Sequence, residues 1–333
     1  MAESHFHFSE KKPLRWGVIG CGGVAEKKSV PAYRNTPGFR VDMVMRRNAD
    51  KAEDYAKRHH IPQWTTDAEE VIFNPEIDAI YIATPPDSHK KYALLVAEAG
   101  KPCCVEKPMA PNYQDSLAIY KAFEEKGLPL FVAYYRRSLP RFLKIKEWLD
   151  DGLIGEVRHI HWEKSKPPNN LDLNGNYNWR TDKQIAPGGY FDDLASHGLD
   201  LFTFLLGDVV EASGIAKNQQ GLYSAFDAVS GVWLHQNGVT GEGFWNFGTH
   251  QRVDKVDIYG SKGKISFSVL DEASLQLENE TGFQTVEIPH PDHIQEFHVA
   301  NIKNHLLGKS FHPSTGKSGV HTSWVMDKIL GTL

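Results

Sequence analysis

Two places in the sequence carry side chains whose types and spacing suit proton transfer to and from a small substrate. Asp193 and His197 stand four residues apart in GGYFDDLASH, and on a helix this spacing puts both on one face. A carboxylate beside an imidazole orients the ring, raises its pKa and suits it to acid–base work near neutral pH. The alternative is an ion pair on a helix surface with no catalytic meaning.

Lys107 is the second place, in the stretch CVEKP, where a predicted strand ends. An ammonium at a strand tip can donate a hydrogen bond to a substrate oxygen and favour the negative charge that develops there. Apolar walls and a positive charge beside it would lower its pKa. The alternative is a lysine that is simply solvated at the end of its strand.

A metal centre is another interpretation of Asp193 and His197, since both residue types are metal ligands. The sequence offers no third or fourth ligand at a recognisable spacing, no His-Glu-x-x-His run and no paired-cysteine motif. We therefore predict that the protein has no metal site. The other histidines are scattered and are expected to be surface or core residues.

A glycine turn ahead of these residues indicates the cofactor that they would serve. The stretch WGVIGCGGVA reads as a buried strand that enters a G-x-G-x-x-A turn and then a helix. Gly20 allows the tight turn, and Gly22 lets the backbone approach a pyrophosphate that the helix N-terminus attracts. Gly20, Gly22, Gly23 and Val24 are therefore predicted to bind a dinucleotide.

The end of the second strand distinguishes the two nicotinamide cofactors. In an NAD site this strand ends in a carboxylate about 20 residues past the turn, which binds the ribose 2′-hydroxyl. Here that place holds Arg46 and Arg47, and Asp42 lies earlier, inside the strand. A guanidinium binds a 2′-phosphate in a bidentate fork, whereas a carboxylate would repel it. The pattern favours NADP, with NAD as the second choice, and the alternative is a pair of solvated surface arginines.

Predicted strands and helices alternate from residue 14 to about 135, which is the pattern of a doubly wound parallel sheet. Ligands of such sheets bind beyond the carboxyl ends of the strands. The residues expected at those ends are the glycine turn, the two arginines, Thr84–Pro85, Lys107 and residues 134–137.

The pattern changes after residue 137. Helices are predicted over 140–150 and 190–206, with a polar loop over 166–184 between them. Strands then follow one another from 209 to about 286 without crossover helices, which predicts a largely antiparallel sheet with one face open for a second subunit. Final helices are predicted over 293–307 and 319–330.

The predicted fold class is therefore α/β: a Rossmann domain followed by an α+β domain with a large open sheet. The predicted divisions are a disordered lead-in over 1–13, a dinucleotide-binding domain over 14–137, and a substrate-binding and oligomerisation domain over 138–333.

Composition excludes several classes of protein. The chain has 333 residues, of which 41% are hydrophobic, and a net charge of −5 without a basic run, so neither nucleic acid nor a membrane surface is an expected partner. No apolar run approaches the ~20 residues of a membrane helix, and the N-terminus lacks the apolar core of a signal peptide. Three cysteines, two of them adjacent, fit a reducing cytoplasm. Cys21, in the glycine turn, is expected to be a small filling residue rather than a reactive thiol.

In the order and spacing of its motifs the chain resembles the Gfo/Idh/MocA oxidoreductases, the glucose-fructose oxidoreductase and inositol dehydrogenase group. The resemblance runs from about Leu14 to Leu330. It rests on GCGGVA at 20–25, IATPPDSH at 82–89, AGKP at 99–102, EKP at 106–108, YRR at 135–137 ahead of Pro140, WR at 179–180, and GG at 188–189 leading to Asp193 and His197.

The resemblance implies a Rossmann domain, a C-terminal domain whose open sheet often forms dimer or tetramer contacts, and hydride transfer between a nicotinamide and a sugar or cyclic polyol. Lys107 would be the active-site lysine, followed by a cis-proline at Pro108. His197 would be the acid–base group, with Asp193 as its helper. Cofactor contacts are expected from Thr84, Pro85, His89, Glu106 and Lys107, and substrate contacts from Tyr135, Arg136 and Arg180.

Two positions depart from the family pattern. The family motif usually reads Asp-x-Gly-x-His, and this chain has Ala195 at the glycine, where a methyl group is a small change. The pair Arg46 and Arg47 replaces the acidic residue of NAD-using members, in line with NADP.

The leading hypothesis is a cytoplasmic, NADP-preferring dehydrogenase or reductase of a sugar or polyol, acting as a homodimer or homotetramer through its C-terminal sheet. A second is an enzyme that retains its cofactor and cleaves a glycosidic bond through transient oxidation. A third is a non-catalytic protein that senses NADP. Lys107, Asp193 and His197 argue against the third, because a sensor needs no proton-transfer pair.

Overall fold

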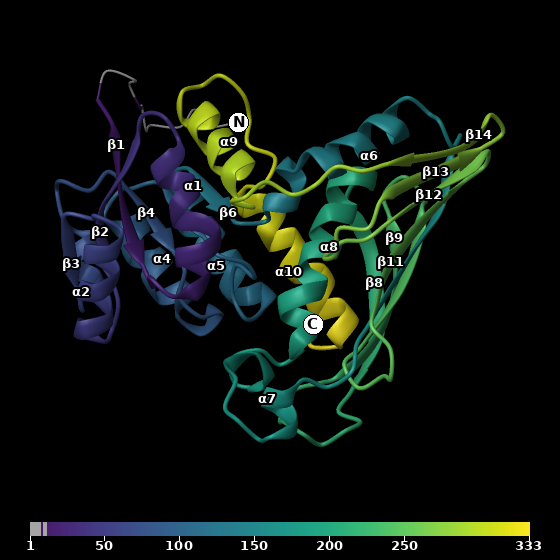
Figure 1. Ribbon diagram of the computed structural model, residues 1–333, viewed down its shortest axis with the longest axis horizontal. Helices are drawn as coiled ribbons and strands as arrows, with labels where there is room; N and C mark the ends of the chain where they lie inside the picture. Colours follow the sequence, from purple (N-terminus) through teal and green to yellow (C-terminus); the bar gives the residue numbers. More distant parts are fainter. Residues whose placement is uncertain (1–7, 9–11) are drawn as a thin grey trace. The chain divides into compact units, whose positions relative to one another are not determined.

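The computed structural model describes residue 8 and residues 12–333, and they pack as two compact units (Figure 1). The first unit comprises the described residues up to Ser138 together with Pro291–Val320, and the second comprises Leu139–His290 together with His321–Leu333. The chain therefore returns to the first unit near its end, a crossing that the sequence pattern does not indicate. The assignment of dinucleotide binding to residues 14–137, and of substrate binding and oligomerisation to residues 138–333, stays a prediction. The lead-in over 1–13 falls almost wholly outside the described residues.

A six-stranded parallel sheet, in the order β3-β2-β1-β4-β5-β6, forms the centre of the first unit and confirms the predicted doubly wound sheet. The strands are Leu14–Ile19 (β1), Phe39–Met45 (β2), Gln63–Thr65 (β3), Ala79–Ile82 (β4), Cys103–Val105 (β5) and Leu130–Val132 (β6). The helices are Val30–Asn35 (α1), Ala49–Arg58 (α2), Ala68–Ile72 (α3), His89–Glu98 (α4), Tyr113–Glu125 (α5) and Glu296–Leu306 (α9).

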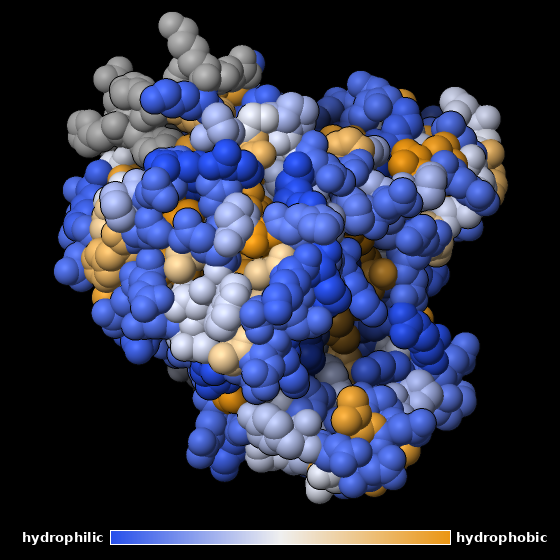
Figure 2. All heavy atoms as spheres, turned by 60° about the vertical axis from the view of Figure 1, so that its left-hand side comes forward, coloured by the Kyte–Doolittle hydropathy of each residue, from blue (hydrophilic) through white to orange (hydrophobic). Residues whose placement is uncertain are grey.

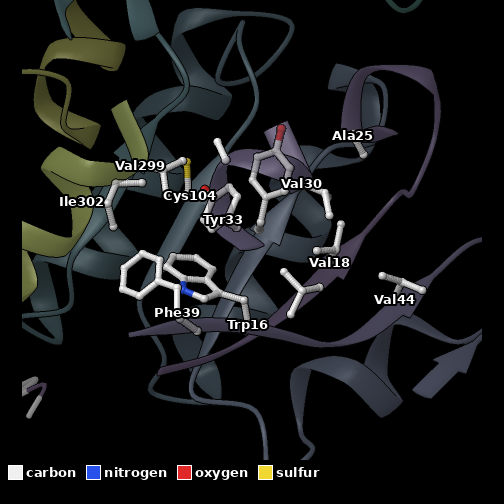
Figure 3. Packing of buried hydrophobic residues seen from close by; sticks show 14 of the residues in the cluster. Trp16, Val18, Ala25, Val30, Tyr33, Phe39, Val44, Cys104, Val299 and Ile302 are labelled. Carbon is white, nitrogen blue, oxygen red and sulfur yellow. The ribbon is translucent and has the colours of Figure 1, made fainter. Parts of the chain in front are cut away.

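Helices cover both faces of this sheet, because successive strand residues point to opposite sides. Helices α1, α2 and α9 pack on one face, where Trp16 meets the ring of Tyr33 at 4.6 Å between centroids (Figure 3). Val299 and Ile302 of α9 belong to the same cluster. Helices α3, α4 and α5 cover the other face. The strands are buried on both sides, as a parallel sheet requires.

The helical segment after the glycine turn is irregular just before Pro31. Residues Ala25–Ser29 form a π-helical turn, and α1 then begins at Val30 with Pro31 in its first turn. Proline has no N–H for the residue four places earlier and its ring crowds that carbonyl. The wider π turn just before it removes the conflict.

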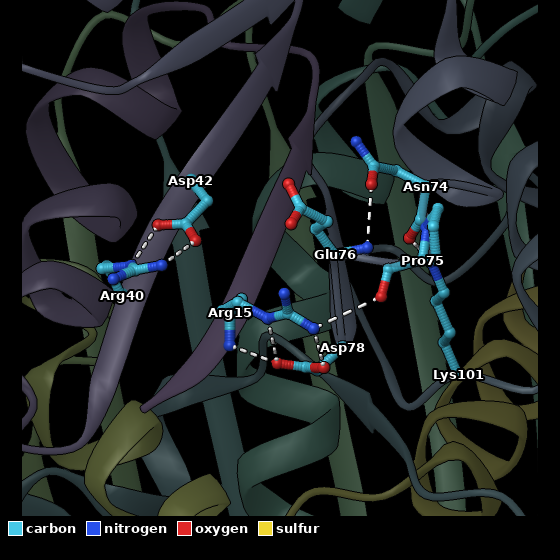
Figure 4. A network of polar contacts seen from close by, with 8 residues as sticks. All are labelled: Arg15, Arg40, Asp42, Asn74, Pro75, Glu76, Asp78 and Lys101. Atoms are coloured by element: carbon cyan, nitrogen blue, oxygen red, sulfur yellow. Dashed lines mark hydrogen bonds and ion pairs between the residues drawn. The ribbon is translucent and has the colours of Figure 1, made fainter. Parts of the chain in front are cut away.

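An ion-pair network joins elements at the amino ends of the strands (Figure 4). Arg15 donates to Asp78 from Nε at 3.0 Å, from Nη2 at 2.9 Å and from its backbone N–H at 2.8 Å. Lys101 donates to the carbonyl of Asn74 at 2.7 Å. These contacts tie β1 to the segment that leads into β4, at the edge opposite the predicted ligand site.

The second unit is built on an eight-stranded sheet in the order β14-β13-β12-β11-β7-β10-β9-β8. Its neighbours are antiparallel except β7 and β10, so the prediction of a largely antiparallel sheet is confirmed with one parallel pair added. The strands are Val157–Ser165 (β7), Val209–Lys217 (β8), Ala228–His235 (β9), Thr240–Asn246 (β10), Val253–Gly260 (β11), Gly263–Phe267 (β12), Leu275–Asn279 (β13) and Gly282–Val286 (β14). The helices are Pro140–Asp150 (α6), Asn170–Leu173 (α7), Tyr190–Leu206 (α8) and Gly316–Leu330 (α10), the last of which begins in the first unit.

Helix α8 packs against the inner face of this sheet at very close range. A Cβ on Gly198 would lie 2.3 Å from the ring of Trp162, so only glycine fits there. The same tryptophan meets Trp245 and Phe202 edge-on, each at 5.5 Å between centroids. Both ends of α8 agree with the predicted 190–206.

The other face of the sheet carries exposed apolar side chains. Val232, Tyr259 and Phe283 are 53%, 41% and 63% exposed, and the strand register puts them on one face. Elsewhere, the part of the surface in Figure 2 is mostly hydrophilic with scattered hydrophobic residues. Among the described helices, none is long and apolar enough to cross a bilayer.

Two buried histidines in the first unit are held uncharged by their surroundings. The rings of His298 and His312 meet edge-on at 4.6 Å, and Phe131 lies 5.0 Å from the ring of His312. Nδ1 of His312 accepts the N–H of Ser314 at 2.9 Å, so its proton is on Nε2, which lies 3.1 Å from the carbonyl of His298. Burial lowers the pKa of His312 to about 3 and lowers the pKa of His298 well below its usual range.

The free energy of unfolding should therefore fall as the pH drops below about 6.5. Below that pH the unfolded chain binds protons that the folded histidines exclude, at about 1.4 kcal/mol per pH unit for each group. We expect His312→Gln to reduce the slope of stability against pH by about one such increment between pH 6 and 4, measured by urea denaturation. His250→Gln, at an exposed histidine, is the control. An unchanged slope in His312→Gln would contradict this prediction.

Candidate functional site

The two central strands of the first unit, β1 and β4, end where the order of strands around the sheet reverses. Gly20 follows β1 with a φ of +96°, and a Cβ there would lie 2.8 Å from both the backbone N and Cγ2 of Thr84. Only glycine adopts this conformation and allows this approach without strain. Ligands of open α/β sheets bind in the crevice at such a reversal.

The turn after Gly20 has room for a ligand. A Cβ added at Gly22 or Gly23 meets no atom of the described residues within 4 Å. The helical segment begins here, because the N–H of Glu26 donates to the carbonyl of Gly22 at 2.9 Å. The first N–H groups of a helix have no partners within it and attract phosphate. The turn therefore fits the pyrophosphate of a dinucleotide.

Arg46 lies beside this turn, at the end of β2. Its Nη1 donates to the carbonyl of Cys21 at 3.3 Å, and its neighbour Arg47 is exposed. Asp42 lies inside β2, where it accepts two hydrogen bonds from Arg40 at 2.5 and 2.6 Å. Asn48, the next residue after the arginines, caps α2. The end of β2 thus presents guanidinium groups and no carboxylate.

Burial decides the character of Cys21. Its side chain is fully buried, and this burial raises the pKa of the thiol to about 11. A protonated thiol is a poor nucleophile. Cys21 is therefore a filling residue of the turn, as predicted.

A buried carboxylate holds the backbone at Lys107, at the end of β5. Glu106 is 7% exposed, and its Oε1 accepts hydrogen bonds from the hydroxyl of Tyr81 at 2.6 Å and from Nε2 of Gln295 at 2.7 Å. Its Oε2 accepts the N–H of Lys107 at 3.1 Å. The peptide bond between Lys107 and Pro108 is cis, as the family resemblance implies.

His89 joins the ends of β4 and β5. Its Nε2 lies 2.8 Å from the carbonyl of Thr84, and its Nδ1 lies 3.1 Å from the carbonyl of Pro108 and 3.3 Å from that of Met109. The ring is fully buried, which lowers its pKa. The observed partners of His89 are thus backbone carbonyls of the two loops that flank Lys107.

The start of α4 carries a serine whose side chain turns away from the helix. Ser88 occupies the capping position but makes no capping bond with its side chain. Its hydroxyl lies instead 2.7 Å from Oγ1 of Thr84 and 2.9 Å from the carbonyl of Pro85. A 3₁₀ turn over Pro86–Ser88 precedes the helix and turns the hydroxyl back toward the strand end.

In the second unit, α8 carries Asp193 and His197 as predicted, on successive turns. Oδ2 of Asp193 accepts a hydrogen bond from Nε of Arg180 at 2.9 Å, and the guanidinium of Arg180 lies 4.3 Å from the ring centroid of Trp179. His197 is 4% exposed. The structure therefore brings together Asp193 and Arg180, two residues that the sequence analysis assigned to separate roles.

Known protein families and relatives match most of the chain. A family model described as "Oxidoreductase family, NAD-binding Rossmann fold" matches residues 14–134, and one described as "GFO/IDH/MocA C-terminal domain" matches residues 142–266. Oxidoreductase P35 of Formosa agariphila is 37% identical over 322 residues, which are 96% of this chain and 99% of that protein. This chain belongs to the Gfo/Idh/MocA oxidoreductase family.

Two further proteins illustrate the family. The 1,5-anhydro-D-fructose reductase of Ensifer adhaerens is 27% identical over 314 residues, 92% of each protein. A solved structure of levoglucosan dehydrogenase in complex with NADH is 24% identical, covers 96% of both chains and has a TM-score of 0.87, which is a likeness of fold. Like other Gfo/Idh/MocA members, this chain is an enzyme of the oxidoreductase class.

The remaining predicted residues of this Gfo/Idh/MocA chain lie inside the protein. Tyr135 and Arg136 begin a 3₁₀ turn after β6, and both are buried. The guanidinium of Arg136 lies 5.0 Å from the ring centroid of Tyr135. Ala195, at the glycine of the family motif, is also fully buried, so the methyl group is accommodated in the packing of α8. Lys107 belongs to the first unit, and Asp193 and His197 belong to the second.

Sequence reasoning missed three polar residues around these sites. Tyr81 is hidden in an apolar strand, and Gln295 lies 189 residues from the glutamate that it binds. Asp192 is buried and accepts the N–H of Gly188 at 2.8 Å, and burial raises its pKa to about 7. Its place in the Asp192–Asp193 pair was the only available signal. In the described part of the chain, no group of three or more His, Cys, Asp or Glu side chains could hold a metal ion.

The hydrogen bonds of Glu106 predict that its charge cannot be replaced by an amide. In Glu106→Gln an amide NH₂ must face a hydrogen-bond donor, which leaves a buried polar group unsatisfied. We expect the free energy of unfolding to fall by about 1–3 kcal/mol in urea denaturation. Glu125→Gln, at an exposed position of α5, should change it by less than about 0.5 kcal/mol. Wild-type stability in Glu106→Gln would show that the three bonds do not hold.

Proposed function

We propose that this enzyme is an NADP-preferring dehydrogenase or reductase that transfers hydride between nicotinamide and a CH–OH or C=O carbon of a sugar or cyclic polyol. The carboxyl ends of β1, β2 and β5 carry an open glycine turn, a guanidinium beside it and Lys107, and this arrangement is the main support. Relatives named for levoglucosan and inositol support the substrate class.

The cofactor would be held by the glycine turn through Gly20, Gly22, Gly23 and Val24, with further contacts from Thr84, Pro85 and Lys107. His89 and Glu106 would hold the backbone beside these contacts in place. When bound, the cofactor would accept or supply the hydride at its nicotinamide ring. Hydrogen bonds hold this part of the site rigid. Glu106 binds the backbone N–H of Lys107, and His89 binds the carbonyl of Pro108.

Lys107 would hold the substrate oxygen as its charge develops. An ammonium donates hydrogen bonds in several directions and so stabilises an oxyanion better than it stabilises a neutral hydroxyl. His197 would take the proton from the substrate hydroxyl, or return it when the reaction runs as a reduction.

Asp193 would orient His197. Because Asp193 also binds Arg180, substrate contact at Arg180 and proton transfer at His197 would share one carboxylate. Tyr135 and Arg136 complete the proposed substrate contacts.

The preference for NADP is proposed from Arg46 and Arg47. Arg46 is already fixed against the glycine turn, so its guanidinium needs little ordering to receive a 2′-phosphate.

Pairing of two or four copies through the open face of the eight-stranded sheet is part of the same proposal. Val232, Tyr259 and Phe283 are exposed on that face, and a second copy packed against it would remove these apolar side chains from water.

Loss of either proton-handling residue should abolish most of the activity. We expect Lys107→Met and His197→Ala each to cut kcat about 100-fold or more while NADPH binding is largely kept. The measurement is NADP reduction and NADPH oxidation against a panel of monosaccharides, inositols and keto-sugars. Lys121→Met and His250→Ala, at exposed positions, are the matched controls. Turnover near the wild-type rate in both site variants would remove the two residues from the mechanism.

The arginines predict a cofactor preference that can be switched. We expect wild type to bind NADPH more tightly than NADH in fluorescence titrations. Arg46→Ala should weaken NADPH binding about 10-fold or more, as expected for a lost hydrogen bond to a charged group, and leave NADH binding unchanged. Arg34→Ala, an exposed arginine of α1, is the control. Tighter binding of NADH by the wild-type protein would refute the preference.

A further inference from the structure

A cavity of about 270 Å³ lies within the second unit, outside the residues proposed for catalysis. One wall is the segment from Asp172, near the end of α7, to Asp182, just after the 3₁₀ turn at Trp179–Thr181. The other wall is the loop of residues 222–224, between β8 and β9. The volume is somewhat below the roughly 300–1,000 Å³ of sites for drug-sized ligands, which fits a single small ring.

The lining of this cavity is rich in groups that bind hydroxyls. It contains two carboxylates, two amides and four hydroxyls: Asp172, Asp182, Asn176, Asn178, Tyr177, Thr181, Tyr223 and Ser224. No lysine, arginine or histidine is among the described residues that line it. Carboxylates accept hydrogen bonds from hydroxyl groups and repel anions. The chemistry therefore favours an uncharged, polyhydroxylated ligand over a phosphate or a carboxylate.

One polar atom of the lining has no hydrogen-bond partner among the residues that the structure describes. It is the buried hydroxyl of Tyr223, whose ring packs edge-on against Tyr190 at 6.1 Å between centroids. A buried hydroxyl without a partner costs free energy in the folded protein. A ligand that draws the Tyr223 hydroxyl into the cavity would remove that cost.

The remaining walls are already fixed by hydrogen bonds. Asp172 accepts the hydroxyl of Tyr190 at 2.8 Å, and Nδ2 of Asn178 donates to the same hydroxyl at 3.0 Å. Asp182 uses Oδ1 to accept the N–H of Gln184 at 3.0 Å. A carboxylate has further lone pairs to offer, so these groups are both held in place and able to accept more bonds.

An aromatic ring stands in the lining beside these polar groups. The side chain of Tyr177 is 75% exposed, which is unusual for so large a ring. A flat aromatic face suits the C–H face of a sugar ring, and the polar walls suit the hydroxyls at its edge. Aromatic and polar groups together are what a saccharide requires.

Hydrogen bonds and neighbouring positions in the chain link the lining of the cavity to the proposed active-site residues of the same unit. Tyr190, which binds Asp172 and Asn178, is the first residue of α8, the helix that carries Asp193 and His197. Thr181 of the lining directly follows Arg180. We propose that the cavity is a subsite for a neutral saccharide ring, adjacent to the ring that is oxidised or reduced. This assignment rests on the proposed function, because it places the subsite beside the sugar ring that would react with the cofactor.

The test compares saccharide binding by wild type and two variants in the absence of cofactor. The probes are cellobiose, maltose and lactose as neutral disaccharides and glucuronate as an anionic sugar, measured by saturation-transfer NMR and calorimetry. We expect the wild type to bind at least one neutral disaccharide and to bind glucuronate more weakly. Tyr177→Ala and Tyr223→Phe should each weaken disaccharide binding about 10-fold.

Both variants should fold, because Tyr177 is exposed and the hydroxyl lost in Tyr223→Phe has no partner to lose. Phe311→Ala removes a 78% exposed ring from the first unit and is the matched control, with unchanged binding expected. Equal binding by wild type, Tyr177→Ala and Tyr223→Phe would overturn the assignment. So would an absence of disaccharide binding by a protein that oxidises or reduces monosaccharides.

The outcome is separable from that of the proposed function. Disaccharide binding that depends on Tyr177 and Tyr223, in a protein that turns over no sugar in the presence of NADP or NADPH, would support the subsite and refute the proposed reaction. Turnover of monosaccharides with no effect of either variant on any disaccharide would refute the subsite alone.

Discussion

The approach of Gly20 to the backbone of Thr84, too close for any Cβ, is the constraint on which the first unit's site depends. It brings the turn after β1 against the end of β4 and leaves Gly22 and Gly23 facing open space. From Thr84 the contacts continue through His89 to Pro108, at the end of β5. Three strand ends are thus joined by one chain of contacts. A site on rigid elements keeps its geometry without further ordering when a ligand arrives.

The polar groups around this chain are buried, which is costly unless every one is satisfied. Glu106 meets that condition with donors from a strand, a neighbouring backbone N–H and the residue ahead of α9. In the second unit, Asp193 is likewise engaged by Arg180. In both units, a carboxylate next to the proposed reactive group is held by residues that do not themselves react. This arrangement holds the backbone of Lys107 and the carboxylate of Asp193 in place.

Much of this could be predicted from the sequence where local chemistry specifies the structure. The ends of α6 and α8 agree with the prediction because Pro140 begins one helix and Gly207 ends the other. The parallel sheet followed from its continuous apolar strands, and the family from the order of its motifs. The structure departs from the prediction where distant residues meet. The parallel pairing of β7 with β10, the donor from Gln295 and the cavity between two loops have no signature within a window of sequence.

The return of residues 291–320 to the first unit has a consequence for how the protein is made. Helix α9 covers part of one face of the six-stranded sheet, and Gln295 completes the hydrogen bonds of Glu106. During synthesis on the ribosome, the strands of this sheet emerge early. Helix α9, which completes the cover of one face, emerges only when almost the entire chain has been made. Until then, Val299 and Ile302 have not reached their places beside Trp16, and apolar surface stays open to chaperones. The first unit therefore begins to form before the second has been made and is completed only after it.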